Sequence, residues 1–194
     1  MTDRKILYQG LSHAAWGYFF LNFNLNLGTV SILPSFVGYI LFYLAIEKLA
    51  GERRDLALLR PLCILLAVWS ALDWLLSWGG GSIDGHALFL DLLAAAAGLY
   101  FQFQFLTDMA ALAEAYCPYS GLDARLRRRR TAYIVLVTAV SLFSTYPGRF
   151  LIRGDDWRTV VMAVLAVVAC IISLLVMAAL FKLRKIFRAS AETV

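Results

Sequence analysis

Apolar residues fill six long segments of this chain, and polar or charged residues separate them. Most of the segments approach the length of about 20 residues that an α-helix needs to cross a bilayer. Because the apolar runs are this long and continuous, we expect an all-α integral membrane bundle of six transmembrane helices. The expected helices are residues 6–23, 34–49, 56–78, 86–116, 131–143 (or as far as 152) and 157–181.

Lysine and arginine residues gather in every second gap between these segments. Since cytoplasmic loops of membrane proteins carry the excess of Lys and Arg, both termini are predicted to be cytoplasmic. The fourth segment is longer than a crossing needs, so its end, with Asp108 and Glu114, is expected to project into the cytoplasm. The run Arg127 to Arg130 could recruit an acidic partner or a lipid, but a role in orienting the chain is sufficient to explain it. The basic residues are Arg4, Lys5, Arg53, Arg54, Arg60, Arg125, Arg127 to Arg130, Lys182, Arg184, Lys185 and Arg188.

The stretch from Leu21 to Leu27 alternates apolar residues with Asn22, Asn24 and Asn26. Period two is the pattern of an extended strand, which would place the three amides on one side. Backbone of this kind is tolerated at membrane depth only where it is buried in protein or lines water. The pattern leaves two interpretations open: an irregular, re-entrant segment between the first two helices, or a helix end that frays into a polar loop.

The composition agrees with a membrane protein, because 61% of the residues are hydrophobic and 16% are charged, with a mean hydropathy of +0.73. Six crossings with short connections use the whole length, so residues 1–194 are predicted to form a single transmembrane domain. The net charge of +5 comes from cations beside apolar segments, which we expect to meet anionic headgroups and not nucleic acid. Cys63, Cys117 and Cys170 form no CxxC motif, and free thiols are expected.

Polar residues inside the apolar segments are the candidates for a binding site. Asp73 and Asp91 lie near the outer ends of neighbouring segments, where a carboxylate is usually paired, protonated or facing water. Helical projection places Gln102 on the same stripe as Asp91. We therefore predict an outward-facing pocket for a small polar or cationic solute, with the two aspartates as charge partners. The predicted ligand-binding residues are Asn22, Asn24, Asn26, Asp73, Asp91 and Gln102.

A structural role for the same aspartates is the interpretation that polar contacts inside membrane bundles more commonly support. In that interpretation they form ion pairs with arginines of the outer loop, such as Arg149 or Arg153, and lock the fold. His13 and His86 fall at opposite ends of their segments, which argues against a shared metal site. The sequence contains no zinc, serine-hydrolase or nucleotide-binding motif, so we expect no catalytic residues and no cofactor.

Gly10, Ala14 and Gly17 fall at i, i+4 and i+7 of the first segment. A face of small residues lets another helix approach closely. This face supports a second hypothesis, in which the chain is a non-catalytic subunit or scaffold that contacts a partner membrane subunit or a second copy of itself. In size and topology alone, the chain also resembles the substrate-binding subunits of energy-coupling-factor vitamin transporters.

A family resemblance rests on the stretch Leu21-Asn-Phe-Asn-Leu-Asn-Leu-Gly-Thr-Val-Ser-Ile-Leu-Pro-Ser-Phe-Val-Gly-Tyr-Ile-Leu. It resembles a pattern in a family of small multi-pass membrane proteins from Gram-positive bacteria, and the resemblance extends loosely from Tyr100 to Arg130. In that family an acidic residue commonly follows the proline, whereas this chain has Ser35. The resemblance implies a bacterial cytoplasmic (inner) membrane and implies no activity.

Overall fold

The computed structural model describes residues 4–23, 26–27, 30–31, 34–78, 88–145 and 155–192. In these residues the architecture is all-α, as predicted. The helices are α1 (Arg4–Asn22), α2 (Ser35–Leu49), α3 (Arg54–Leu58), α4 (Arg60–Trp78), α5 (Leu88–Tyr116), α6 (Leu122–Thr145) and α7 (Asp155–Glu192). The 3-10 turn η1 (Pro118–Ser120) follows α5, and two short extended pieces, β1 (Asn26–Leu27) and β2 (Val30–Ser31), lie between α1 and α2.

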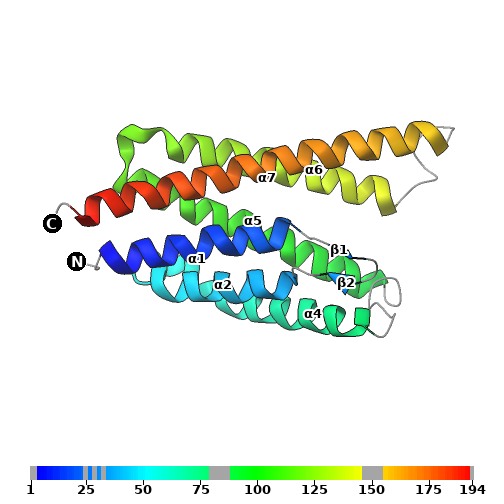
Figure 1. The fold of residues 1–194 in the computed structure, drawn as a ribbon, viewed down its shortest axis with the longest axis horizontal. Coiled ribbons are helices and arrows are strands. Elements are labelled where there is room, and N and C mark those ends of the chain that lie inside the picture. The colour runs from blue at the N-terminus through cyan, green and yellow to red at the C-terminus, as the bar shows by residue number, and fades with distance from the viewer. Residues whose placement is uncertain are drawn as a thin grey trace.

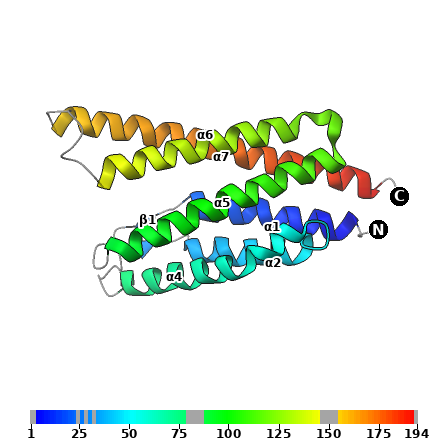
Figure 2. The same ribbon diagram turned by 180° about the vertical axis from the view of Figure 1, so that it is seen from behind.

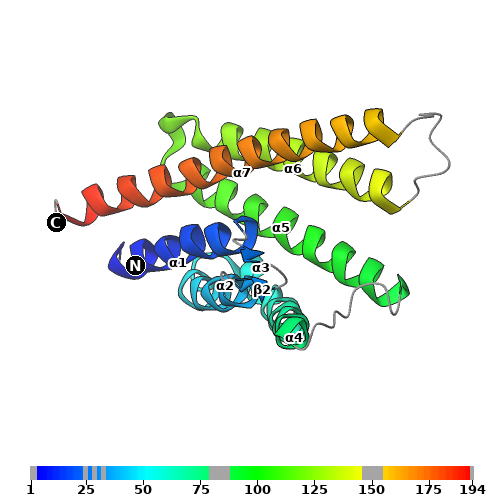
Figure 3. The same ribbon diagram turned by 45° about the vertical axis from the view of Figure 1, so that its right-hand side comes forward.

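The long helices run roughly side by side and alternate in direction (Figure 1). Both termini lie at one end of the bundle, and the view from behind places η1 and the start of α6 at that end as well (Figure 2). Figure 3 shows α5 between two groups of helices, with α1, α2 and α4 on one side and the α6–α7 hairpin on the other. The two groups also meet directly, because α1 packs against α7.

Three of the described helices are long and apolar enough to cross a membrane, at Arg60–Trp78, Phe89–Tyr116 and Val160–Arg188. Much of their apolar surface is exposed: Leu65 is 61% exposed and Val167 is 60% exposed. An extended apolar surface is unfavourable in water and is typical of proteins that contact lipid or other proteins. These three helices therefore indicate a membrane protein.

The buried core occupies the half of the bundle nearest the termini. Along α4 the last buried residue is Leu66, whereas along α5 and α7 the first buried residues are Phe101 and Ser173. In the centre, the Phe42 ring packs edge-on against Phe101 and Phe105, with centroids 5.3 and 4.6 Å apart. Among the residues whose burial is described, α4 beyond Leu66, α5 before Phe101 and α7 before Ser173 contain none that is fully buried.

Two glycines bring α1 and α2 into backbone contact. A Cβ atom on Gly38 would lie 2.9 Å from the Gly17 carbonyl oxygen and 3.0 Å from the Leu21 amide nitrogen. A Cβ atom on Gly10 would lie 2.7 Å from Leu49 Cγ. The small-residue face predicted for the first helix therefore packs against α2 of the same chain.

One predicted helix is divided. The segment expected at 56–78 is split at Leu59 into α3 and α4. Pro61, in the first turn of α4, has no amide hydrogen to donate to Ala57, four residues earlier, and its ring would clash with that carbonyl. The prediction of one continuous helix was wrong because the apolar pattern continues through Leu59, whereas the helical hydrogen bonding of the backbone is interrupted there.

Two other helices extend beyond their predicted ends. Helix α6 begins at Leu122 and not at residue 131, and α7 continues past residue 181 to Glu192. Apolar content, which set the predicted bounds, stops at the arginine and lysine clusters. Arg, Lys and Leu are nevertheless good helix formers, so the helices continue through these clusters.

The alternating stretch is part helix and part extended. Asn22 is the last residue of α1, whereas Asn26 and Leu27 are extended and pair antiparallel with Ser31 and Val30. Asn24 lies outside the described residues. The extended pattern predicted from Leu21 therefore does not begin there, because helix α1 includes Leu21 and Asn22.

Candidate functional site

A pocket of about 330 Å³ lies between α2, α4, α5 and the end of α1. Asp73 on α4 and Asp91 on α5 both line it, so the structure brings together the two carboxylates that the sequence singled out. This volume is at the lower end of the roughly 300–1,000 Å³ typical of small-molecule sites. The lining residues are Leu21, Ser35, Tyr39, Leu66, Trp69, Ser70, Asp73, Asp91, Ala94 and Ala95.

Helical periodicity explains how the pocket is built. On α4, Leu66, Trp69, Ser70 and Asp73 fall at i, i+3, i+4 and i+7, which is one face of a helix. On α5, Asp91 is followed on the same face by alanines at i+3 and i+4, whose small side chains leave space in front of it. The sequence therefore positions both carboxylates through ordinary helical spacing.

The pocket wall combines negative charge with aromatic rings. Asp73 and Asp91 are both half-buried, and the aromatic residues Trp69 and Tyr39 also line the pocket. Tyr39 is held in place by an edge-on contact with Phe101, at 5.8 Å between ring centroids, and its carbonyl accepts a hydrogen bond from Cys63 Sγ at 3.1 Å. Carboxylates and ring faces both attract cations.

Asn22 belongs to a different polar cluster. Its Oδ1 accepts hydrogen bonds from Tyr133 Oη at 2.9 Å and from Ser173 Oγ at 3.4 Å, and its Nδ2 donates to the Tyr18 carbonyl at 3.0 Å. The Gln102 side chain lies beside the Tyr133 hydroxyl group. Because these contacts link α1 with α5, α6 and α7, the cluster has the form of interhelical structural contacts.

The six predicted ligand-binding residues therefore separate. Asp73 and Asp91 share the pocket, while Asn22 and Gln102 lie in the interhelical cluster. Asn24 and the side chain of Asn26 lie outside the described residues, as do His86, Arg149 and Arg153. The placement of Gln102 on the Asp91 stripe was insufficient to predict its surroundings, because Gln102 lies three helical turns farther along α5.

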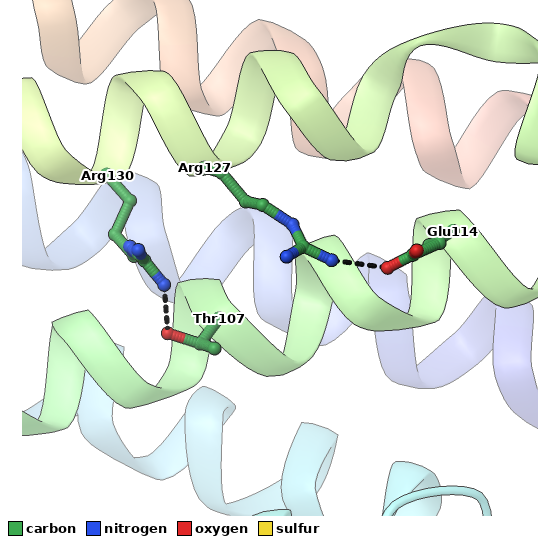
Figure 4. Close-up of polar contacts among 4 residues, drawn as sticks. All are labelled: Thr107, Glu114, Arg127 and Arg130. Carbon is green, nitrogen blue, oxygen red and sulfur yellow. Dashed lines mark hydrogen bonds and ion pairs between the residues drawn. The ribbon is translucent and has the colours of Figure 1, made fainter.

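The arginine run at the start of α6 makes structural contacts that the sequence pattern did not predict. Arg127 forms an ion pair with Glu114, and Arg130 donates a hydrogen bond to Thr107 Oγ1 at 2.6 Å; both contacts join α6 to α5 (Figure 4). The Arg130 guanidinium also lies 4.2 Å from the centroid of the Phe103 ring. The i, i+3 spacing of the two arginines was the available signal, since it places them on one face of a helix.

Asp108, which was predicted to project into the cytoplasm with the end of its helix, is buried within the protein. The residue is only 3% exposed, and its two carboxylate oxygens are each 3.4 Å from Gln104 Nε2, one turn earlier on α5. Arg53 and Asp55, at the start of α3, are close enough to affect the Asp108 carboxylate electrostatically. The short helix α3 covers this part of α5, and that arrangement could not be predicted from a segment assumed to be continuous.

Within the described residues, no group of three or more His, Cys, Asp or Glu side chains could hold a metal ion. The lining of the pocket offers two carboxylates, hydroxyl groups and aromatic residues.

Comparison of the chain with protein-family models, with curated proteins and with solved structures finds no match.

Proposed function

We propose that this chain is a six-crossing protein of a bacterial cytoplasmic membrane and that its pocket opens outward and binds a small cationic solute. The observation that carries the proposal is that Asp73 and Asp91, on consecutive long helices, line one pocket together with Trp69 and Tyr39. A ligand with a positive charge and a small apolar body matches both kinds of wall.

The distribution of charge supports cytoplasmic termini. Both termini, η1 and the start of α6 lie at one end of the bundle (Figures 1 and 2). Basic residues follow the same end, because they occupy the start of α6 and the last part of α7. The pocket lies toward the opposite end, since Asp73 is near the end of α4 and Asp91 is near the start of α5. By the positive-inside rule the pocket then faces outward.

Burial explains why α1 and α2 can be crossing helices although they are less apolar or shorter than the three found by length and composition. Leu11, Ala14 and Tyr18 of α1 are buried, as are Phe42 and Ala45 of α2. Helices surrounded by other helices contact less lipid, so a crossing there tolerates polar residues and a short apolar length. Helix α6 is also absent from those three, but for a different reason: its first half contains the arginine run, which lowers its apolar content.

The subunit or scaffold hypothesis has no comparable support. The glycines that would have offered a docking face, Gly10 and Gly17, are in contact with α2. A face that is already packed within the chain is not accessible to a partner helix. We therefore favour an autonomous solute-binding protein of the transport type.

Neutralising either pocket aspartate is expected to weaken cation binding at least tenfold. In Asp73→Asn and Asp91→Asn the side chain keeps its size but loses its charge, and tenfold corresponds to about 1.4 kcal/mol. Binding of choline, ethanolamine and tetramethylammonium to the detergent-solubilised full chain would be measured by calorimetry. A neutral alcohol with the shape of choline should bind much more weakly than choline.

Asp123→Asn is the matched control, because Asp123 is a half-buried acid in the first turn of α6 and does not line the pocket. This variant should bind like the unmodified chain. Equal affinity for choline and the neutral alcohol would contradict the proposal. So would failure of both pocket variants to fold while Asp123→Asn folds, because the aspartates would then be structural.

A further inference from the structure

The arginine run of α6 divides into residues that face the bundle and residues that face outward. Arg127 and Arg130 contact α5 (Figure 4), and Arg129 Nη1 donates a hydrogen bond to the Leu175 carbonyl of α7 at 2.5 Å. Arg125 and Arg128 are instead exposed on α6. Contacts between helices therefore explain Arg127, Arg129 and Arg130, and they do not explain the exposed residues Arg125 and Arg128.

Helix α7 has one exposed stripe that changes from apolar to basic. Ile171, Leu174, Ala178, Lys182 and Lys185 are all exposed and follow one another at spacings of three or four residues, so they share one face. The apolar part suits contact with acyl chains, and the basic part suits the headgroup layer. In the proposed embedding, the change after Ala178 is at the level of the membrane boundary.

Helix α6 repeats this pattern in the opposite chain direction. Arg125, Arg128, Ala132 and Val135 are exposed at spacings of three or four residues. Basic residues lie toward η1, and the apolar residues follow them. The adjacent antiparallel helices α6 and α7 therefore both change from basic to apolar in the same direction (Figure 1).

The Arg129–Leu175 hydrogen bond sets the two stripes at a common level. From this bond, Arg125 lies about 6 Å along α6 and Lys182 lies about 10 Å along α7, at a rise of 1.5 Å per residue. Because the helices are antiparallel, both displacements point to the end that holds the termini. The Arg125 guanidinium and the Lys182 ammonium groups therefore differ in level by only about 5 Å, which is close enough for both to meet the phosphate of one lipid.

We propose that α6 and α7 form a binding site for an anionic phospholipid of the cytoplasmic leaflet. Arg125 and Lys182 contact the phosphate headgroup, Arg128 and Lys185 extend the basic surface on either side of it, and the acyl chains lie along the apolar parts of the two stripes. Arginine binds phosphate through paired hydrogen bonds, and lysine adds a point charge. The proposal rests on the membrane embedding proposed above and is independent of the pocket.

The test is native mass spectrometry of the detergent-solubilised full chain titrated with phosphatidylglycerol or phosphatidylcholine. We expect tighter binding of phosphatidylglycerol, and about a twenty-five-fold loss in the double variant Arg125→Gln, Lys182→Gln, at roughly fivefold for each basic residue. The charge-preserving variant Arg125→Lys, Lys182→Arg should retain most of the affinity. Arg54→Gln, which removes an exposed arginine of α3, should change it less than about twofold.

Three results would overturn this site. Equal binding of the two lipids would remove the requirement for anionic charge. A loss in Arg54→Gln as large as in Arg125→Gln alone would indicate diffuse attraction to the basic end. Displacement of the lipid by excess inorganic phosphate would indicate a site for the free ion. Lipid affinity is measured without any ammonium compound, so these results are distinguishable from failure of the pocket.

Discussion

Replacement of Gly38 by leucine is expected to prevent α1 and α2 from packing and to lower the free energy of unfolding by more than about 3 kcal/mol. Even a Cβ atom at this position would lie 2.9 Å from the Gly17 carbonyl oxygen, and that neighbour is backbone. Overpacking against side chains typically costs about 1–3 kcal/mol because they can rotate away. Backbone cannot, so the two helices must separate.

Gly51→Leu is the matched control, because a Cβ atom on Gly51 would meet nothing within 4 Å. Thermal unfolding of both variants would be followed in detergent by size-exclusion chromatography after heating. Gly51→Leu should unfold close to the temperature of the unmodified chain. Similar stability of the Gly38 and Gly51 variants would show that α1 and α2 do not cross at the glycines.

Phe42→Ala is expected to cost about 3–5 kcal/mol, the range found when large buried aromatic side chains are truncated. Phe42 is 1% exposed and contacts the rings of Phe101 and Phe105, so it joins the helices on one side of α5 to α5 itself. The same Phe101 ring supports Tyr39 of the pocket. Choline binding should therefore weaken together with stability in this variant.

Phe89→Ala gives the comparison for Phe42→Ala, because Phe89 is 74% exposed on the outer half of α5. Its truncation removes few contacts with the chain and should shift the unfolding temperature only slightly. The same heating assay measures both. If truncating the exposed ring were as costly as truncating the buried one, the outer half of α5 would have to pack against protein that this structure does not contain.

The fold class and the pocket carboxylates could be predicted from the sequence because both depend on local spacing. Long apolar runs indicate helices irrespective of their neighbours, and two aspartates in apolar segments are conspicuous. Trp69 and Ser70 could have been added, since they share the helical face of Asp73. Tryptophan and serine are common in membrane helices, so their presence beside Asp73 did not by itself indicate a binding face.

The remaining features depend on which helices meet. Asn22 and Gln102 lie outside the pocket because α6 brings Tyr133 against them. Asp108 is buried because the chain breaks at Leu59 and folds α3 over α5. Neither contact follows from periodicity, which places a residue on a face of its helix but does not identify the helix opposite that face.

The most direct test of the account is labelling of single cysteines with a membrane-impermeant maleimide in intact cells. Burial raises the pKa of the Cys117 thiol, which slows its reaction with maleimide but does not prevent it. To remove all background labelling, Cys63, Cys117 and Cys170 would be replaced by alanine before a new cysteine is added. Ser70→Cys then reports on the pocket, and Tyr119→Cys reports on the exposed turn η1.

An outward-facing pocket in a chain with cytoplasmic termini predicts opposite behaviour for the two positions. Ser70→Cys should react in intact cells, and tetramethylammonium should slow the reaction. Tyr119→Cys should react only after the membrane is opened. Labelling of Tyr119→Cys in intact cells, or labelling of Ser70→Cys at a rate that tetramethylammonium leaves unchanged, would contradict the account.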